Sequence, residues 1–96
     1  MIKINRLGNY LNQLREIKGV SFREVSKKTG ISHTYLSNLE KGYDPRSGKE
    51  ISPSPHTIRK LSNYYNKPYV DVMNMAGYMT LEDIHEVFRK SDIDEQ

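Results

Sequence analysis

Apolar residues recur along this chain at intervals of three and four positions, which is the spacing of helices that bury one face. The first such segment runs from about residue 6 to residue 18 and ends before Gly19, a residue suited to the left-handed end of a helix. Its apolar stripe consists of Leu7, Tyr10, Leu11, Leu14 and Ile17. We expect this helix to place the stripe against the core.

Two shorter helices follow, and the turn between them is very short. A capping box of the form S-x-x-E at residues 21–24 begins the second helix, because each side chain can satisfy a free backbone N–H of the other residue. Gly30 ends this helix, Ser32 caps the third, and Gly42 ends the third. A single residue, Ile31, lies between the glycine and the next cap, which is typical of a helix-turn-helix.

The helical pattern stops after the third helix and resumes after residue 53. Prolines, glycine and serine over residues 43–53 predict an extended loop, which carries Arg46 and Lys49. A fourth helix begins after the Ser54 cap, with proline in its first turn, and ends at Asn66.

Two more segments complete the chain. A fifth helix is expected over residues 68–77, and a sixth begins at the Thr80 cap and precedes an acidic tail. The sequence therefore predicts an all-α protein. We expect a five-helix domain over residues 1–78, followed by an additional C-terminal helix and acidic tail over residues 79–96 that serve packing, dimerisation or linkage.

The net charge of +3 is unevenly distributed along the 96 residues. Residues 1–60 contain twelve Lys/Arg and five Asp/Glu, a net of +7, whereas residues 61–96 contain three and seven, a net of −4. A basic first half can hold a polyanion through several phosphate contacts. A solvated surface with a chance imbalance of charge is the alternative.

Several classes of protein are excluded by what the sequence lacks. Without cysteine there is no disulfide, no thiolate zinc site and no cysteine nucleophile. The three histidines lack the spacing of metal ligands, so we expect no metal and no cofactor. We find no nucleophile elbow, P-loop or zinc-protease motif, and predict no catalytic residue and no enzyme activity. No segment has the length of a membrane span or the pattern of a signal peptide, which favours a cytoplasmic protein.

The third helix has two chemically distinct faces at 100° per residue. Its apolar face consists of Tyr35, Leu36 and Leu39, and its polar face consists of His33, Thr34, Ser37, Asn38 and Lys41. Carboxamide, hydroxyl and imidazole groups can bond to base edges in the major groove of DNA, and a threonine methyl can contact thymine. An ordinary exposed face is the alternative, although such faces more often carry Glu/Lys pairs.

Residues 21–42 resemble the helix-turn-helix of the lambda-repressor/Cro family, also called the xenobiotic-response-element family. The matching positions are Ser21, Glu24, Val25, Gly30, Ile31-Ser32, Tyr35-Leu36-Ser37, Leu39-Glu40 and Gly42. The similarity extends less sharply over about residues 5–78 and implies the five-helix fold. Two positions depart from the family: Phe22 replaces a common glutamine whose amide meets a phosphate, and Ser26 replaces a common alanine where the two helices cross closely.

The resemblance implies a set of DNA contacts and one structural pair. Base reading is expected from His33, Thr34, Ser37 and Asn38. Phosphate contacts are expected from Ser32, Lys41, Tyr43 and Arg46, with further charge from Arg23, Lys27 or Lys28 in place of the missing glutamine and from Lys49 in the loop. Arg15 and Glu40 match a pair that ties the first helix to the end of the third.

The leading hypothesis is therefore a sequence-specific regulator of transcription that binds double-stranded DNA. We expect a homodimer on an inverted-repeat operator, because one such domain forms a small interface with DNA. The resemblance implies a bacterial or phage-encoded repressor of phage or mobile-element type. An antitoxin of the same fold, which grips a partner protein through its acidic C-terminal half, is the alternative, and a helical protein-interaction domain is a third.

Overall fold

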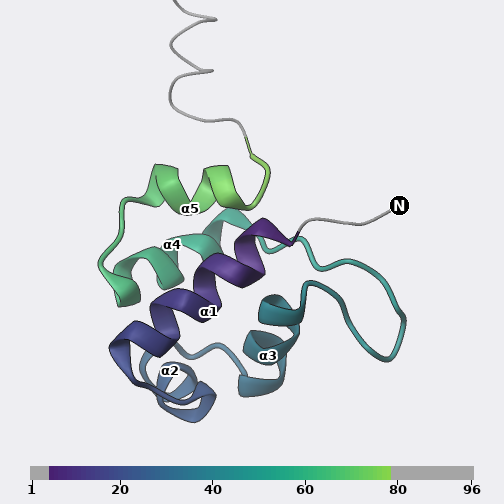
Figure 1. Cartoon of the computed structure of the whole chain (residues 1–96), viewed down its shortest axis with the longest axis horizontal. Coiled ribbons are helices and arrows are strands. Elements are labelled where there is room, and N and C mark those ends of the chain that lie inside the picture. The colour runs from purple at the N-terminus through teal and green to yellow at the C-terminus, as the bar shows by residue number, and fades with distance from the viewer. Residues whose placement is uncertain (1–4, 79–96) are drawn as a thin grey trace, which may run out of the picture.

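The computed structural model describes residues 5–78, and these residues form five α-helices (Figure 1). In chain order the helices are α1 (Arg6–Lys18), α2 (Phe22–Thr29), α3 (His33–Lys41), α4 (Pro55–Tyr65) and α5 (Tyr69–Met75). Residues 5–78 contain no strand, and an isolated antiparallel bridge joins Tyr43 to Glu50. The predicted all-α class with five helices is confirmed. The predicted sixth helix lies outside the described residues.

Local capping fixes the boundaries of the first four helices where the sequence placed them. The hydroxyl groups of Ser21, Ser32 and Ser54 each accept a hydrogen bond from the backbone N–H three residues later, at 3.1–3.2 Å. At the other end, α4 stops at Asn66, which takes a left-handed conformation with φ of 55°. The fifth helix is shorter than the predicted 68–77, because the N–H of Gly77 bonds to the carbonyl oxygen of Asn74, three residues earlier, and does not continue the α-helical pattern.

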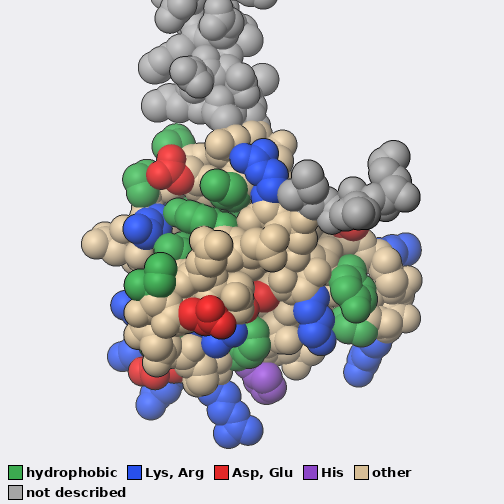
Figure 2. Space-filling model, in the orientation of Figure 1, with side chains coloured by type: hydrophobic (Ala, Val, Ile, Leu, Met, Phe, Trp, Pro, Cys, Tyr) green, Lys and Arg blue, Asp and Glu red, His purple; other side chains and the backbone are tan. Residues whose placement is uncertain are grey.

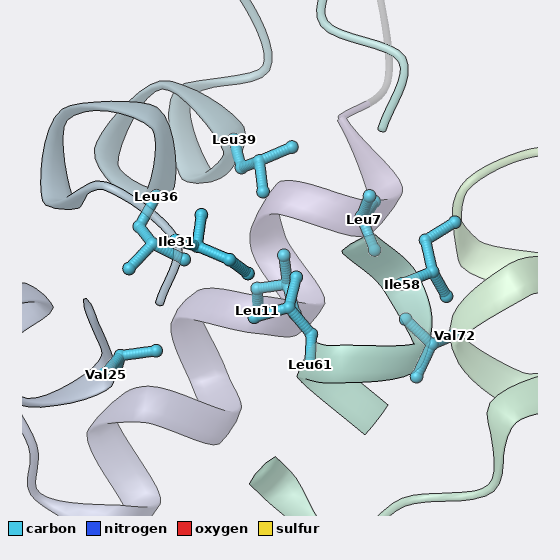
Figure 3. Close-up of a cluster of buried hydrophobic side chains, with 9 residues drawn as sticks. All are labelled: Leu7, Leu11, Val25, Ile31, Leu36, Leu39, Ile58, Leu61 and Val72. Atoms are coloured by element: carbon cyan, nitrogen blue, oxygen red, sulfur yellow. The ribbon is translucent and has the colours of Figure 1, made fainter. Parts of the chain in front are cut away.

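The core forms where α1 crosses the middle of the molecule, with α2 and α3 on one side and α4 and α5 on the other (Figure 1). Side chains from all five helices and from the α2–α3 turn meet there (Figure 3). The cluster consists of Leu7, Leu11, Val25, Ile31, Leu36, Leu39, Ile58, Leu61 and Val72. Because α3 contributes two buried leucines, its opposite face is free to meet a ligand.

One position of the predicted apolar stripe was wrong. Ile17 is 84 % exposed, whereas Leu14, one turn earlier on α1, is 8 % exposed. Periodicity determines the direction in which a side chain points, but burial also requires a neighbouring element that covers it. The last turn of α1 lacks such a neighbour on the side of Ile17 within the described residues.

The segment after α3 is a folded hairpin and not the extended loop that the sequence suggested. The bridge between Tyr43 and Glu50 aligns its two legs, and the N–H of Asp44 donates to the carbonyl oxygen of Lys49 at 2.8 Å. The order of aspartate, proline and, further on, glycine in residues 44–48 suits a tight turn. We refer to residues 43–50 as the hairpin loop.

Candidate nucleic-acid interface

The turn between α2 and α3 is built from Gly30 to Ser32. The N–H of Gly30 donates to the carbonyl oxygen of Ser26 at 2.8 Å, with Gly30 at a φ of 81° that strains other residues. Ile31 then points into the core and is 9 % exposed, while the Ser32 hydroxyl caps α3. This turn fixes the angle between the two helices and therefore the direction in which α3 presents its polar face.

The two faces of α3 differ in burial as well as in chemistry. Leu36 and Leu39 are 4 % and 2 % exposed. Tyr35 is half-buried, and burial raises the pKa of its phenol, with a smaller contribution from Tyr78. On the opposite side, His33, Thr34 and Lys41 are exposed, and Ser37 and Asn38 are half-buried.

A cleft of about 510 Å³ lies between this polar face and the hairpin loop. From α3 it is lined by His33, Thr34, Ser37, Asn38 and Lys41, and from the loop by Asp44, Pro45 and Arg46. The fold thus brings together the four expected base-reading residues and two of the expected phosphate-contacting residues. The cleft joins polar hydrogen-bonding groups to two cations, a combination that suits the edge and backbone of a nucleic acid.

Comparison with models of protein families matches residues 8–78 to a helix-turn-helix domain. The chain belongs to this helix-turn-helix family. The matched range includes α2 to α5 and most of α1, so the resemblance predicted from residues 21–42 is confirmed.

Named relatives of this helix-turn-helix chain come from Bacillus subtilis (strain 168). It is 33 % identical over 79 residues to the HTH-type transcriptional repressor RghR, covering 82 % of this chain and 53 % of RghR. It is 24 % identical over 90 residues to the HTH-type transcriptional regulator SinR, covering 94 % of this chain and 68 % of SinR. An uncharacterized regulator, RghRB, is 31 % identical over 81 residues, with 82 % and 54 % covered. The chain thus spans about half the length of RghR and RghRB.

The other expected phosphate-contacting residues surround the helix-turn-helix without lining the cleft. Arg23 and Lys27 are exposed on α2, and Tyr43 and Lys49 are exposed on the hairpin loop. Ser32 is exposed at the start of α3, with its hydroxyl engaged by the N–H of Tyr35. Lys and Arg side chains gather along the side of the molecule formed by α2 and α3, at the lower edge of the view in Figure 2.

A network centred on Glu40 joins α1 to the end of α3. The Glu40 carboxylate accepts from Arg15 Nε at 2.8 Å and Nη2 at 3.2 Å, and from Asn12 Nδ2 at 2.9 Å. The Glu40 backbone carbonyl accepts from Asn5 Nδ2 at 2.9 Å. The structure therefore brings Arg15 and Glu40 together as a bidentate pair, which fixes α3 relative to the rest of the helix-turn-helix domain.

Phe22, at the position where the resemblance implies a glutamine, packs against the Arg15 side chain of this pair. The guanidinium carbon of Arg15 lies 4.1 Å from the centroid of the Phe22 ring, in a cation–π arrangement. Arg15 Nη1 also donates to the carbonyl oxygen of Val20 at 3.1 Å. The Phe22 ring at the start of α2 thus supports the Arg15 cation that pairs with Glu40.

Tyr65 lies close to this network and gives a prediction for alkaline pH. Burial raises the pKa of its phenol, the charge of Glu40 and Tyr64 raise it further, and Arg15 opposes them. The fold therefore favours the neutral phenol, and the stability that this contributes is present below pH about 10 and lost as pH rises above it. We expect Tyr65→Phe to flatten the fall in unfolding free energy above pH about 10, measured by urea titration at several pH values.

Tyr43→Phe is the matched control for this prediction, because the Tyr43 side chain is 46 % exposed. It should leave the alkaline slope unchanged. A Tyr65→Phe variant with the slope of the parent would show that Tyr65 ionises equally readily in the folded and unfolded states.

Sequence reasoning missed four residues that shape this site. Asn5 and Asn12 were not singled out, although both bind Glu40, and Gly8 was not recognised as the point where α1 approaches α3. Asn5 had a local signal as a favoured capping residue directly before α1, where its side chain accepts from the N–H of Gly8 at 3.0 Å. Asp44 had one as well, because an aspartate followed by proline and, three residues later, glycine is typical of a turn. Partners of a side chain across 28 or 35 residues have no such signal.

Residues 5–78 contain neither a metal-binding cluster nor a membrane-spanning helix. No group of three histidine, aspartate or glutamate residues in that range is arranged to hold a metal ion. No helix in the same range combines the length and the hydropathy needed to cross a bilayer.

Proposed function

We propose that this chain is the DNA-binding part of a transcriptional regulator and that α3 reads the major groove of double-stranded DNA. The observation that carries the proposal is the cleft beside α3, where the polar face, which includes Lys41, meets Arg46 of the hairpin loop while the opposite face is anchored in the core. Membership of the helix-turn-helix family and the names of the relatives support the same function.

Base reading is assigned to the polar face of α3. Asn38 can form two hydrogen bonds with adenine, Thr34 can place its methyl group against thymine, and His33 can donate to guanine. Ser37 lies in the same cleft and can bond to more than one base. Partial burial of Ser37 and Asn38 limits their rotamers, so that less freedom is lost on binding.

Phosphate contacts are assigned to the residues around that face. Lys41 and Arg46 line the cleft, and Ser32 lies at the start of α3. The remaining assigned residues are Arg23, Lys27, Tyr43 and Lys49. Such contacts fix the position of the protein on the duplex without carrying sequence information.

The assembly and the biological role extend the proposal. We infer a homodimer on an inverted-repeat operator, with half-sites about one helical turn apart, and a repressor, as RghR is named. The phage or mobile-element type and the cytoplasmic location remain predictions from the sequence. The division into a DNA-binding domain over residues 1–78 and a segment over 79–96 for packing, dimerisation or linkage is likewise a proposal.

The antitoxin alternative finds no support in the relatives reported above, which are named as regulators or repressors. Purification of the chain from its host with a stoichiometric protein partner would favour it. Purification of the chain without such a partner, together with binding to a selected duplex, favours the regulator.

Selection of bound sites from a random duplex library tests the proposed function directly. A recovered consensus is expected, and two-fold symmetry within it would support the homodimer. Binding without any consensus, with a steep dependence on salt, would reduce the function to general electrostatic attraction to DNA.

Asn38→Ala is expected to relax base preference at one position of that consensus by about 1–3 kcal/mol. Competition binding with duplexes altered at single positions measures the effect. Lys41→Ala is the matched variant on the same face, and it should weaken binding to all sequences and reduce the salt dependence by about one ion. Equal weakening of every duplex by Asn38→Ala would contradict its role in base reading.

A further inference from the structure

The hairpin loop after α3 is organised by one acidic residue. The N–H of Asp44 donates to the Lys49 carbonyl oxygen at 2.8 Å, and the Asp44 carbonyl oxygen accepts from the N–H of Gly48 at 2.7 Å. The Asp44 carboxylate Oδ1 accepts from the backbone N–H of Arg46 at 2.9 Å. The backbone of Asp44 thus connects the first half of the loop to Gly48 and Lys49. Its side chain constrains the backbone of Arg46 at the turn.

The returning leg of the hairpin loop is anchored to the body of the domain. The N–H of Ile51 donates to the carbonyl oxygen of Gly42 at 3.3 Å, and the Ile51 side chain packs against the core cluster. Pro53 is buried, and its carbonyl oxygen accepts from the Tyr78 hydroxyl at 2.9 Å. The base of the loop is therefore fixed relative to α3 before any ligand arrives.

The charge of Asp44 opposes the ligand that the cleft would receive. Asp44 is the one acidic residue among the described residues that line the cleft. A carboxylate there repels DNA phosphates, so its presence weakens binding unless it serves another purpose. The hydrogen bond from the backbone N–H of Arg46 supplies that purpose, because it constrains the backbone of a residue that lines the same cleft.

We propose that Asp44 is a positioning residue that holds the backbone of Arg46 beside the polar face of α3. In this position Arg46 binds a DNA phosphate next to the bases that α3 reads. This inference rests on the proposed function. A preformed loop loses less conformational freedom on binding than a flexible one, and an arginine whose backbone is already positioned therefore binds the phosphate more tightly.

The variants Asp44→Asn and Asp44→Ala separate two properties of the carboxylate, its hydrogen bond with the N–H of Arg46 and its negative charge. Asp44→Asn keeps an oxygen that accepts from the N–H of Arg46 and removes the negative charge. Asp44→Ala removes both. If the hydrogen bond matters, the asparagine variant should bind DNA at least as tightly as the parent, whereas the alanine variant should bind more weakly despite losing the same charge.

The experiment is a double-mutant cycle between Asp44 and Arg46 in the full chain. Dissociation constants are measured on the duplex recovered from the random library, over a series of salt concentrations. Arg46→Ala is expected to lower affinity about tenfold and to reduce the salt dependence by about one ion. Asp44→Ala should lower affinity by about threefold to tenfold in the parent and cause no further loss in the Arg46→Ala background.

Ser47→Ala is the matched control within the loop. Its hydroxyl accepts from the N–H of Lys49 at 3.2 Å, but neither Ser47 nor Lys49 lines the cleft, so the variant should lose less affinity than Asp44→Ala. Thermal unfolding of every variant, followed by circular dichroism, checks that the domain is folded. Should the alanine variant fail to fold, Asp44→Ser replaces it in the cycle, because the shorter hydroxyl bonds the turn more weakly.

Three results would overturn the inference. Equal gains in affinity for Asp44→Ala and Asp44→Asn would reduce Asp44 to a repelling charge. A loss for Asp44→Ala that persists in the Arg46→Ala background would show that the loop acts without Arg46. If the parent chain yields no consensus in the selection, the proposed function fails and this inference fails with it, whereas the first two results leave the proposed function intact.

Discussion

Glu40→Ala is expected to lower the free energy of unfolding by about 3 kcal/mol. The Glu40 side chain is 10 % exposed, and both its carboxylate oxygens accept hydrogen bonds from α1. Truncation leaves the Arg15 cation, which is 18 % exposed, and the Asn12 amide without this partner. The expected loss lies at the lower end of the range for buried pairs, because water reaches part of the Arg15 side chain.

Urea unfolding followed by circular dichroism measures this loss. Glu16→Ala is the matched control, since Glu16 is an exposed glutamate on α1, and it should change stability by less than about 0.5 kcal/mol. An apolar pair in place of both residues, Arg15→Met with Glu40→Leu, should recover most of the loss. Equal effects of the Glu40 and Glu16 variants would mean that the pair orients α3 without stabilising the domain.

Gly8→Ala is expected to destabilise the domain by about 3 kcal/mol, although alanine normally favours a helix over glycine by about 1 kcal/mol. A Cβ atom at Gly8 would lie 2.5 Å from the backbone carbonyl oxygen of Glu40 and would also overlap the Asn5 side chain. The carbonyl oxygen belongs to the last turn of α3 and cannot rotate away. The added methyl group therefore forces α1 and α3 apart and strains the Glu40 network.

Gln13, an exposed residue of α1, provides the control. At Gly8 we expect alanine to be less stable than glycine, which is the reverse of its usual effect in a helix. Gln13→Ala should be more stable than Gln13→Gly by about 1 kcal/mol, as expected for an open helical position. If alanine also stabilises position 8 by that amount, the approach of α1 to α3 is looser than the structure shows. Because α3 moves with this contact, weaker DNA binding should accompany the lost stability.

The helix boundaries could be predicted because their causes lie within a few residues. Ser32 bonds to the N–H three residues later, and Gly42 ends the same helix in a left-handed conformation. The polar face of α3 could be predicted for the same reason, since helical geometry alone places Thr34 and Asn38 on one side.

Other predictions failed because their causes lie elsewhere in the chain. Ile17 matched the apolar stripe of α1 and is exposed, since no described element covers it. The hairpin loop was expected to be extended, but pairing of Tyr43 with Glu50 and the hydrogen bonds of Asp44 fold it back. The composition of residues 43–53 predicted a loop, but it did not predict that Tyr43 would pair with Glu50.

The sequence by itself determined the five helices, the short turn before α3 and the chemical contrast between the two faces of α3. Capping and periodicity are local, and these features follow from them. The tertiary structure decided that Asp44 and Arg46 of the hairpin loop lie beside the polar face, and that Asn5 and Asn12 join the expected pair of Arg15 and Glu40. Their positions depend on contacts between segments distant in sequence, for which the order of residues carries no local signal.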